Sequence, residues 1–194
     1  FKVFGFSFIV LKLVPLVCTI VSGFFVYKMV WEKIGVREAV IALILFLFSY
    51  DSMRFSGYAV GVNLTTMFAV MGIYFLLNKK YVLSGVFQGV AGITGLYSLI
   101  LPLVILAVLF FKNKKSFLRF LIGFGVVFFV TNLIFMVVAG SDYVNSVYGY
   151  HLSKPSEESN EFIVLGRLVR VNMLLFVAFF ASLHYKREAS VLLV

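Results

Sequence analysis

The chain has 194 residues, of which 62% are hydrophobic, and its 17 Lys and Arg against 8 Asp and Glu give a formal net charge of +9. So large an apolar fraction excludes a water-soluble globular domain. The basic residues stand in short clusters between apolar stretches, so the charge predicts a membrane topology and excludes nucleic acid as a partner.

The apolar stretches predict an all-α, polytopic transmembrane helix bundle with about seven membrane elements. In chain order these are residues 9–27, 38–49, 59–77, 81–93, 98–111, 120–139 and 162–184. Element 38–49 would be only about 20 Å long, shorter than the ~30 Å hydrocarbon core, and the fourth and fifth elements are short as well. Short or broken helices are tolerated where their backbone is buried in protein or lines a wet cavity, so we expect a cavity.

Four basic loops alternate with polar breaks along the chain. The breaks are residues 50–58, 94–98 and 140–160, and the basic loops are residues 28–37, 79–80, 112–119 and 186–187. Successive spans reverse direction, and basic loops stay in the cytoplasm. We therefore predict a multi-pass cell-membrane protein with cytoplasmic basic loops and a cavity that opens to the opposite face.

One membrane domain is expected over residues 1–194, with an external loop at residues 140–161. The chain opens with Phe1 inside an apolar segment and shows no signal peptide, so we expect a piece of a longer protein. The single cysteine, Cys18, excludes a disulfide within the chain and a cysteine-based metal site. A divalent cation stays open as a cofactor, although the sequence shows no cluster of ligands for one.

Small and polar residues inside the spans predict how the helices pack. Three glycines at spacings of four and three favour close helix contact: Gly85, Gly89 and Gly92. Four polar side chains are interpreted as hydrogen-bonding groups between helices rather than as ligands: Gln88, Asn63, Thr65 and Thr66.

Basic side chains on the predicted external side are the candidate binding residues. Arg167 and Arg170 share one helix face and are interpreted as paired donors for a phosphate, with contact to lipid headgroups as the alternative. Arg54 faces the same side, and its alternative is an ion pair with Asp51. Asp51 is in turn a candidate catalytic carboxylate because it lies close to a span end.

His151 and Lys154 lie together in the predicted external loop and are candidates for hydrogen bonding to an anionic group. A lone histidine does not predict a metal site. The sequence has no nucleophile elbow, no phosphate-binding glycine loop and no HExxH motif, so the residues alone do not establish an enzyme.

Residues 71–97, MGIYFLLNKKYVLSGVFQGVAGITGLY, followed by Leu101-Pro102-Leu103, resemble membrane glycosyltransferases of the GT-C superfamily, which use polyprenyl-phosphate-linked sugars. In that superfamily a span ends at a short basic turn, continues into a Gly-rich half-span and reaches a Thr-Lys-like turn before a short helix opened by Pro. Gly95 stands where that Lys usually lies. The string YHLSKP at residues 150–155 is similar to an external-loop motif of some members.

The resemblance implies a multispan enzyme that transfers a sugar from a polyprenyl-phosphate donor on the non-cytoplasmic face. Its catalytic acid would lie in a first external loop, upstream of residue 1. The residues implied as lipid-phosphate or acceptor contacts are Arg54, His151, Lys154, Arg167 and Arg170, and the implied partners are membrane lipid and the sugar donor.

Two other functions remain open from the sequence. A transporter-like module for an anionic substrate would use Arg167 and Arg170 as attractors, but no ionisable residue falls near the centre of a long span. A non-catalytic membrane subunit would bind a membrane protein partner through a lipid-facing stripe of small residues at 85–92.

Overall fold

The computed structural model describes residues 8–49 and 61–149, which form helices joined by short turns, with no strand in these ranges. The elements are α1 (Phe8–Lys33), α2 (Val36–Leu47), α4 (Gly61–Leu77), α5 (Tyr81–Thr94), the 3-10 turn η1 (Leu96–Leu99), α6 (Ile100–Lys112), α7 (Lys114–Val144) and the π turn η2 (Asn145–Gly149). The predicted all-α fold is confirmed.

The lengths and surfaces of the helices suit a membrane. Two described helices are long and apolar enough to cross one, over Lys12–Lys33 and Lys114–Gly149. They are accompanied by three shorter apolar helices: Gly61–Leu77, Tyr81–Thr94 and Leu96–Lys112. Large apolar side chains are exposed along the helices, for example Val137 and Val138 of α7, at 78% and 79%. Lipid covers such side chains in a bilayer, so the chain forms an all-α membrane bundle.

Each predicted element within the described ranges is a helix, but two helices are longer than predicted. α1 continues past residue 27 to Lys33, and α7 begins at Lys114 rather than at residue 120. The early start of α7 is explained by Asn113, whose side-chain oxygen accepts hydrogen bonds from the backbone N–H groups of Lys115 (3.0 Å) and Ser116 (3.2 Å). The predicted element at 162–184 lies outside the described residues.

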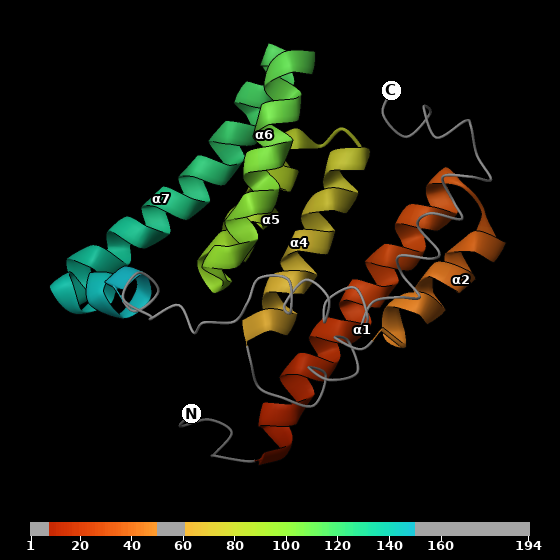
Figure 1. Ribbon diagram of the computed structural model, residues 1–194, viewed down its shortest axis with the longest axis horizontal. Coiled ribbons are helices and arrows are strands. Elements are labelled where there is room, and N and C mark those ends of the chain that lie inside the picture. The colour runs from red at the N-terminus through yellow and green to blue at the C-terminus, as the bar shows by residue number, and fades with distance from the viewer. Residues whose placement is uncertain (1–7, 50–60, 150–194) are drawn as a thin grey trace, which may run out of the picture.

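Four helices form a row in the order α1, α4, α5 and α7 (Figure 1). α4 contacts both α1 and α5, α5 contacts both α4 and α7, α2 lies on α1, and α6 lies on α7. The three basic turns in the described part of the chain join α1 to α2, α4 to α5 and α6 to α7, and all lie at the upper ends of the helices in Figure 1. We call this the basic end of the bundle. The end of α2, the start of α4, the α5–α6 junction and the end of α7 lie at the opposite end.

The contact between α5 and α7 depends on glycine in both helices. A Cβ atom added to Gly85 would lie 2.2 Å from the carbonyl oxygen of Phe120, and one added to Gly123 would lie 2.2 Å from that of Val82. Backbone therefore meets backbone directly across this interface. The glycines at 85, 89 and 92 face α7 and its neighbours rather than lipid, which confirms their predicted role in helix packing.

Polar side chains join α4 to α5 as predicted for Gln88 and Thr65, while the role of Asn63 stays a prediction. Gln88 is fully buried and donates from Nε2 to the carbonyl oxygen of Ala69 at 3.1 Å. The hydroxyls of Thr65 and Thr94 hydrogen bond across the interface at 2.9 Å. The prediction was wrong for Thr66, which donates to a carbonyl of its own helix at 2.8 Å, an ordinary bond for a threonine inside a helix.

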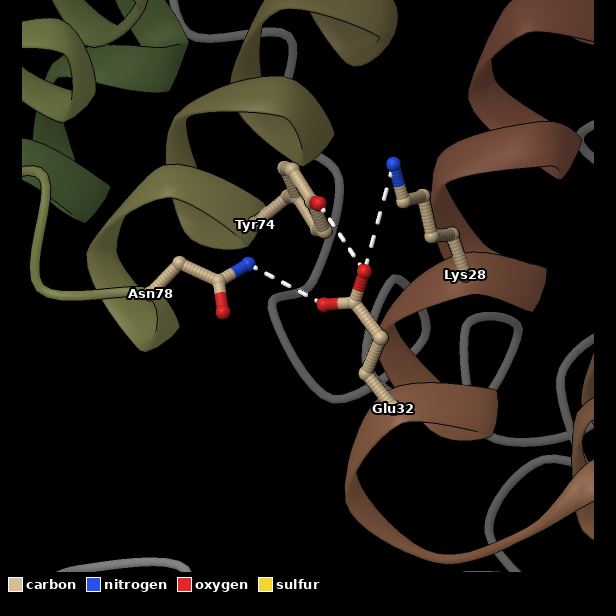
Figure 2. Close-up of polar contacts among 4 residues, drawn as sticks. All are labelled: Lys28, Glu32, Tyr74 and Asn78. Carbon is tan, nitrogen blue, oxygen red and sulfur yellow. Dashed lines mark hydrogen bonds and ion pairs between the residues drawn. The ribbon is translucent and has the colours of Figure 1, made fainter.

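At the basic end, hydrogen bonds to a carboxylate join α1 to α4 (Figure 2). The Glu32 carboxylate accepts hydrogen bonds from the hydroxyl of Tyr74 at 3.1 Å and from Nδ2 of Asn78 at 3.2 Å, and Lys28 Nζ lies 3.9 Å from it. Lys28 Nζ also lies 5.3 Å from the centre of the Tyr74 ring, in the range of a cation–π contact. The two helix ends are thereby held beside each other.

Candidate functional site

The end of the bundle opposite the basic turns holds hydrogen-bonding side chains at two places. One is the α5–α6 junction, and the other is the end of α7. Both lie at the end of the bundle toward which the cavity was expected to open. The described residues include no cluster of three His, Cys, Asp or Glu that could hold a metal ion. Asp142, which is exposed, is the only carboxylate at this end within the described ranges.

The α5–α6 junction is a helix break at Gly95. α5 ends at Thr94, Gly95 is extended (φ −162°, ψ 107°), and η1 follows directly, so the predicted interruption near residues 94–98 is confirmed. The hydroxyl of Ser98 is buried and has no hydrogen-bond partner among the described residues. The break therefore holds this buried hydroxyl and, at the end of α5, the hydrogen bond between Thr94 and Thr65.

The geometry explains why a glycine stands at position 95. A Cβ atom there would lie 2.9 Å from Oγ1 of Thr65 and 2.7 Å from Cε1 of Tyr97. The start of α4 also lies close to the end of α5, because a Cβ atom added to Gly61 would lie 3.3 Å from the carbonyl oxygen of Thr94. A longer side chain at position 95, such as the lysine typical of the superfamily, would have to displace one of these neighbours.

The end of α7 folds back on itself. Gly140 has φ 57° and ψ −136°, a conformation that side-chain-bearing residues rarely adopt, and it interrupts the helix. Beyond it, the hydroxyls of Tyr143 and Tyr148 both donate to Oδ1 of Asn132, each at 2.6 Å. Asn132 itself is 7% exposed and donates from Nδ2 to the carbonyl oxygen of Phe128. We call Asn132, Tyr143 and Tyr148 the tyrosine clip.

The clip fixes the first part of the predicted external loop against α7. The segment from Gly140 to Gly149, which the sequence analysis placed in that loop, is helical on both sides of the break and ends in η2. Tyr143 also stacks on Phe135, with ring centroids 5.4 Å apart. The position at which the chain leaves α7 toward His151 is therefore set by side-chain contacts rather than by α7 alone.

All the site residues predicted from the sequence lie outside the described residues: Asp51, Arg54, His151, Lys154, Arg167 and Arg170. Four of them adjoin described elements along the chain. Asp51 and Arg54 stand between α2 and α4, and His151 and Lys154 follow η2. The ends of these elements lie at the end opposite the basic turns in Figure 1.

Sequence reasoning missed the tyrosine clip. Asn132 is a strongly polar side chain inside a long apolar span, and that is the signal that could have singled it out. Its partners could not be named, because Tyr143 and Tyr148 reach it only after the chain reverses at Gly140.

The described helices form a membrane bundle, with hydrogen-bonding side chains at the α5–α6 junction and at the end of α7. Comparison with known families shows which bundle it is: the model of glycosyltransferase family 87 matches residues 1–193, so the chain belongs to this family. The family is a membrane glycosyltransferase family of the GT-C type, which agrees with the resemblance noted in the sequence. No curated protein and no solved structure matches the chain.

Proposed function

We propose that this chain is part of a membrane glycosyltransferase that transfers a sugar from a polyprenyl-phosphate donor on the non-cytoplasmic face. Its family supports the transfer of a sugar in a membrane setting. The polyprenyl-phosphate donor follows from the resemblance of residues 71–103 to the GT-C superfamily.

The observation that carries the proposed orientation is the separation of charge in the bundle. The described basic turns lie at one end, and the helix break, the tyrosine clip and the neighbours of the candidate site residues lie at the other. Basic loops stay in the cytoplasm, so the polar end would face the opposite side. The reaction would then take place at that end.

In the proposed reaction an acceptor hydroxyl attacks the anomeric carbon, the bond from that carbon to the phosphate oxygen breaks, and the polyprenyl phosphate leaves with both electrons. A base takes the proton of the acceptor hydroxyl. Arg167 and Arg170 would stabilise the charge that develops on the leaving phosphate. Arg54, His151 and Lys154 would contact the phosphate or the acceptor, with Asp51 as a secondary acid.

A transfer assay on the full-length protein in lipid vesicles, with polyprenyl-phosphate sugars as donors, tests this proposal. Arg167→Ala/Arg170→Ala is expected to lower the rate by about 100-fold or more, since loss of one preorganised donor to developing charge already costs about that much. The matched control is Lys33→Ala/Arg37→Ala, which removes two exposed cations from the basic end and is expected to retain the wild-type rate. Equal loss in both double variants, or no transfer by the wild type from any such donor, would contradict the proposal.

The orientation is tested separately by labelling with a membrane-impermeant maleimide. Lys79→Cys and Ser153→Cys are each introduced after replacement of the native cysteines, which in this chain means Cys18. In intact cells we expect label at position 153 and, only after permeabilisation, at position 79. The reverse pattern would place the polar end in the cytoplasm.

The two alternative functions are less well supported. The subunit hypothesis required the glycines at 85, 89 and 92 to face lipid, but these residues pack within the bundle. No contact within the described residues favours transport of an anionic substrate over sugar transfer.

A further inference from the structure

Two of the basic turns lie beside each other at the basic end. Tyr81, at the start of α5, packs on the buried cluster that contains Leu109 of α6 and Phe120 of α7. The α4–α5 turn therefore lies next to the α6–α7 turn. We call these two turns the basic pair. They carry six exposed cations: Lys79, Lys80, Lys112, Lys114, Lys115 and Arg119.

The charge of the basic pair is not balanced along its own part of the chain. The sequence contains no Asp or Glu from residue 52 to residue 141. Glu32 of α1, the helix that packs on α4, accepts hydrogen bonds from Tyr74 and Asn78 and lies 3.9 Å from Lys28. The two turns thus concentrate positive charge at one place on the membrane surface.

Lys79 is held in a backbone conformation that favours glycine. It has φ 57° and follows the last turn of α4, where its N–H donates to the carbonyl oxygen of Leu76 and the N–H of Lys80 donates to that of Phe75, both at 2.9 Å. This is a Schellman ending, whose left-handed position is usually Gly. A lysine there is less favourable for the backbone than a glycine.

Exposed aromatic side chains adjoin these cations. Phe111, directly before Lys112, is 85% exposed, and Phe110 is 50% exposed. Apolar rings beside cations at a helix end match a phospholipid, whose acyl chain contacts the rings while its phosphate contacts the cations. A soluble phosphate ion has no apolar part that could contact the rings.

We propose that the basic pair binds the headgroups of anionic phospholipids. This surface lies at the end of the bundle opposite the candidate transfer site and does not depend on the proposed reaction. Cations close to an anionic bilayer surface each strengthen association by up to about fivefold, so six of them form an effective site. The attraction is electrostatic and therefore weakens as the salt concentration rises.

The test uses the full-length protein in bilayers that contain spin-labelled phosphatidylglycerol or spin-labelled phosphatidylcholine. Electron spin resonance then gives the relative association constant of the two lipids. We expect selectivity for phosphatidylglycerol in the wild type and loss of most of it in Lys112→Gln/Lys114→Gln/Lys115→Gln/Arg119→Gln, which leaves the Asn113 cap in place. The charge-conserving control, Lys112→Arg/Lys114→Arg/Lys115→Arg, should retain it.

Lys79→Gly separates binding from folding. It removes one cation while relieving the left-handed strain, so we expect a higher unfolding midpoint together with selectivity lower by up to about fivefold. Unchanged selectivity in the glutamine variant, or equal loss in the arginine control, would overturn the proposal. So would displacement of the labelled phosphatidylglycerol by inorganic phosphate at constant ionic strength, because the ligand would then be a soluble anion.

Discussion

Gly123→Ala is the most direct test of how this bundle is held together. The added Cβ atom would lie 2.2 Å from the carbonyl oxygen of Val82 and 3.1 Å from the backbone N of Val86. To reach ordinary contact at 3.4 Å or more, α5 and α7 would have to move apart along their shared interface. Backbone atoms cannot swing away as a flexible side chain can, so the whole helix pair must adjust.

The expected cost follows from two opposing terms. Overpacking in a close-packed interior costs about 1–3 kcal/mol, and rigid neighbours favour the upper part of that range. Replacing Gly by Ala within a helix returns about 0.5–1 kcal/mol. The net loss in the free energy of unfolding for Gly123→Ala is therefore on the order of 2 kcal/mol.

Gly125 provides the control in the same helix. Its added Cβ atom would meet Cδ2 of Phe129 at 3.7 Å, an ordinary contact, so Gly125→Ala should be neutral or more stable by up to about 1 kcal/mol. Both variants would be unfolded by SDS in dodecylmaltoside micelles and followed by susceptibility to proteolysis. Equal stability of the two variants would refute the argument that backbone contact at Gly123 controls the interface.

Three further substitutions test the opposite end of the bundle in the same unfolding assay. Gly140→Ala should lose about 1–2 kcal/mol from the left-handed backbone alone, since no atom lies within 4 Å of the added Cβ, and stability like that of wild type would mean that the break relaxes. Thr65→Val should lose about 1 kcal/mol through its bond to Thr94, and an equal further loss on adding Thr94→Val would show that the two hydroxyls do not interact. In the Asn132→Leu background, Tyr148→Phe should hardly change the free energy of unfolding, because the acceptor of the Tyr148 hydroxyl is already gone. The same loss of stability on Tyr148→Phe in that background as in the wild type would argue against the tyrosine clip.

The fold could be predicted well from the sequence because a bilayer permits few solutions. Any apolar segment of sufficient length must satisfy its own backbone hydrogen bonds, so it becomes a helix. The clusters of Lys and Arg then mark the turns on one side. Helix boundaries were less certain where polar residues continue a helix, as Asn113 and Lys114 do at the start of α7.

The candidate site was predicted only in outline. Its cations and acid were chosen by residue type and by the side of the membrane, and they lie outside the described residues. Resemblance to a family supplied their proposed roles, which no contact described above tests. The tyrosine clip was not foreseen, because the partners of Asn132 are separated from it by a chain reversal that no periodicity predicts.

The sequence by itself determined the environment of this protein, its helical elements, the alternation of basic and polar turns and, through residues 1–193, its family. These properties depend on the residue types and on their spacing along the chain, and both can be determined without knowing how the helices pack. Only the tertiary structure decided which glycine faces which backbone, which side chains a residue larger than glycine at position 95 would meet, and where the chain leaves α7. Those features depend on distances of a few ångströms between helices, and such distances exist only after the helices have packed.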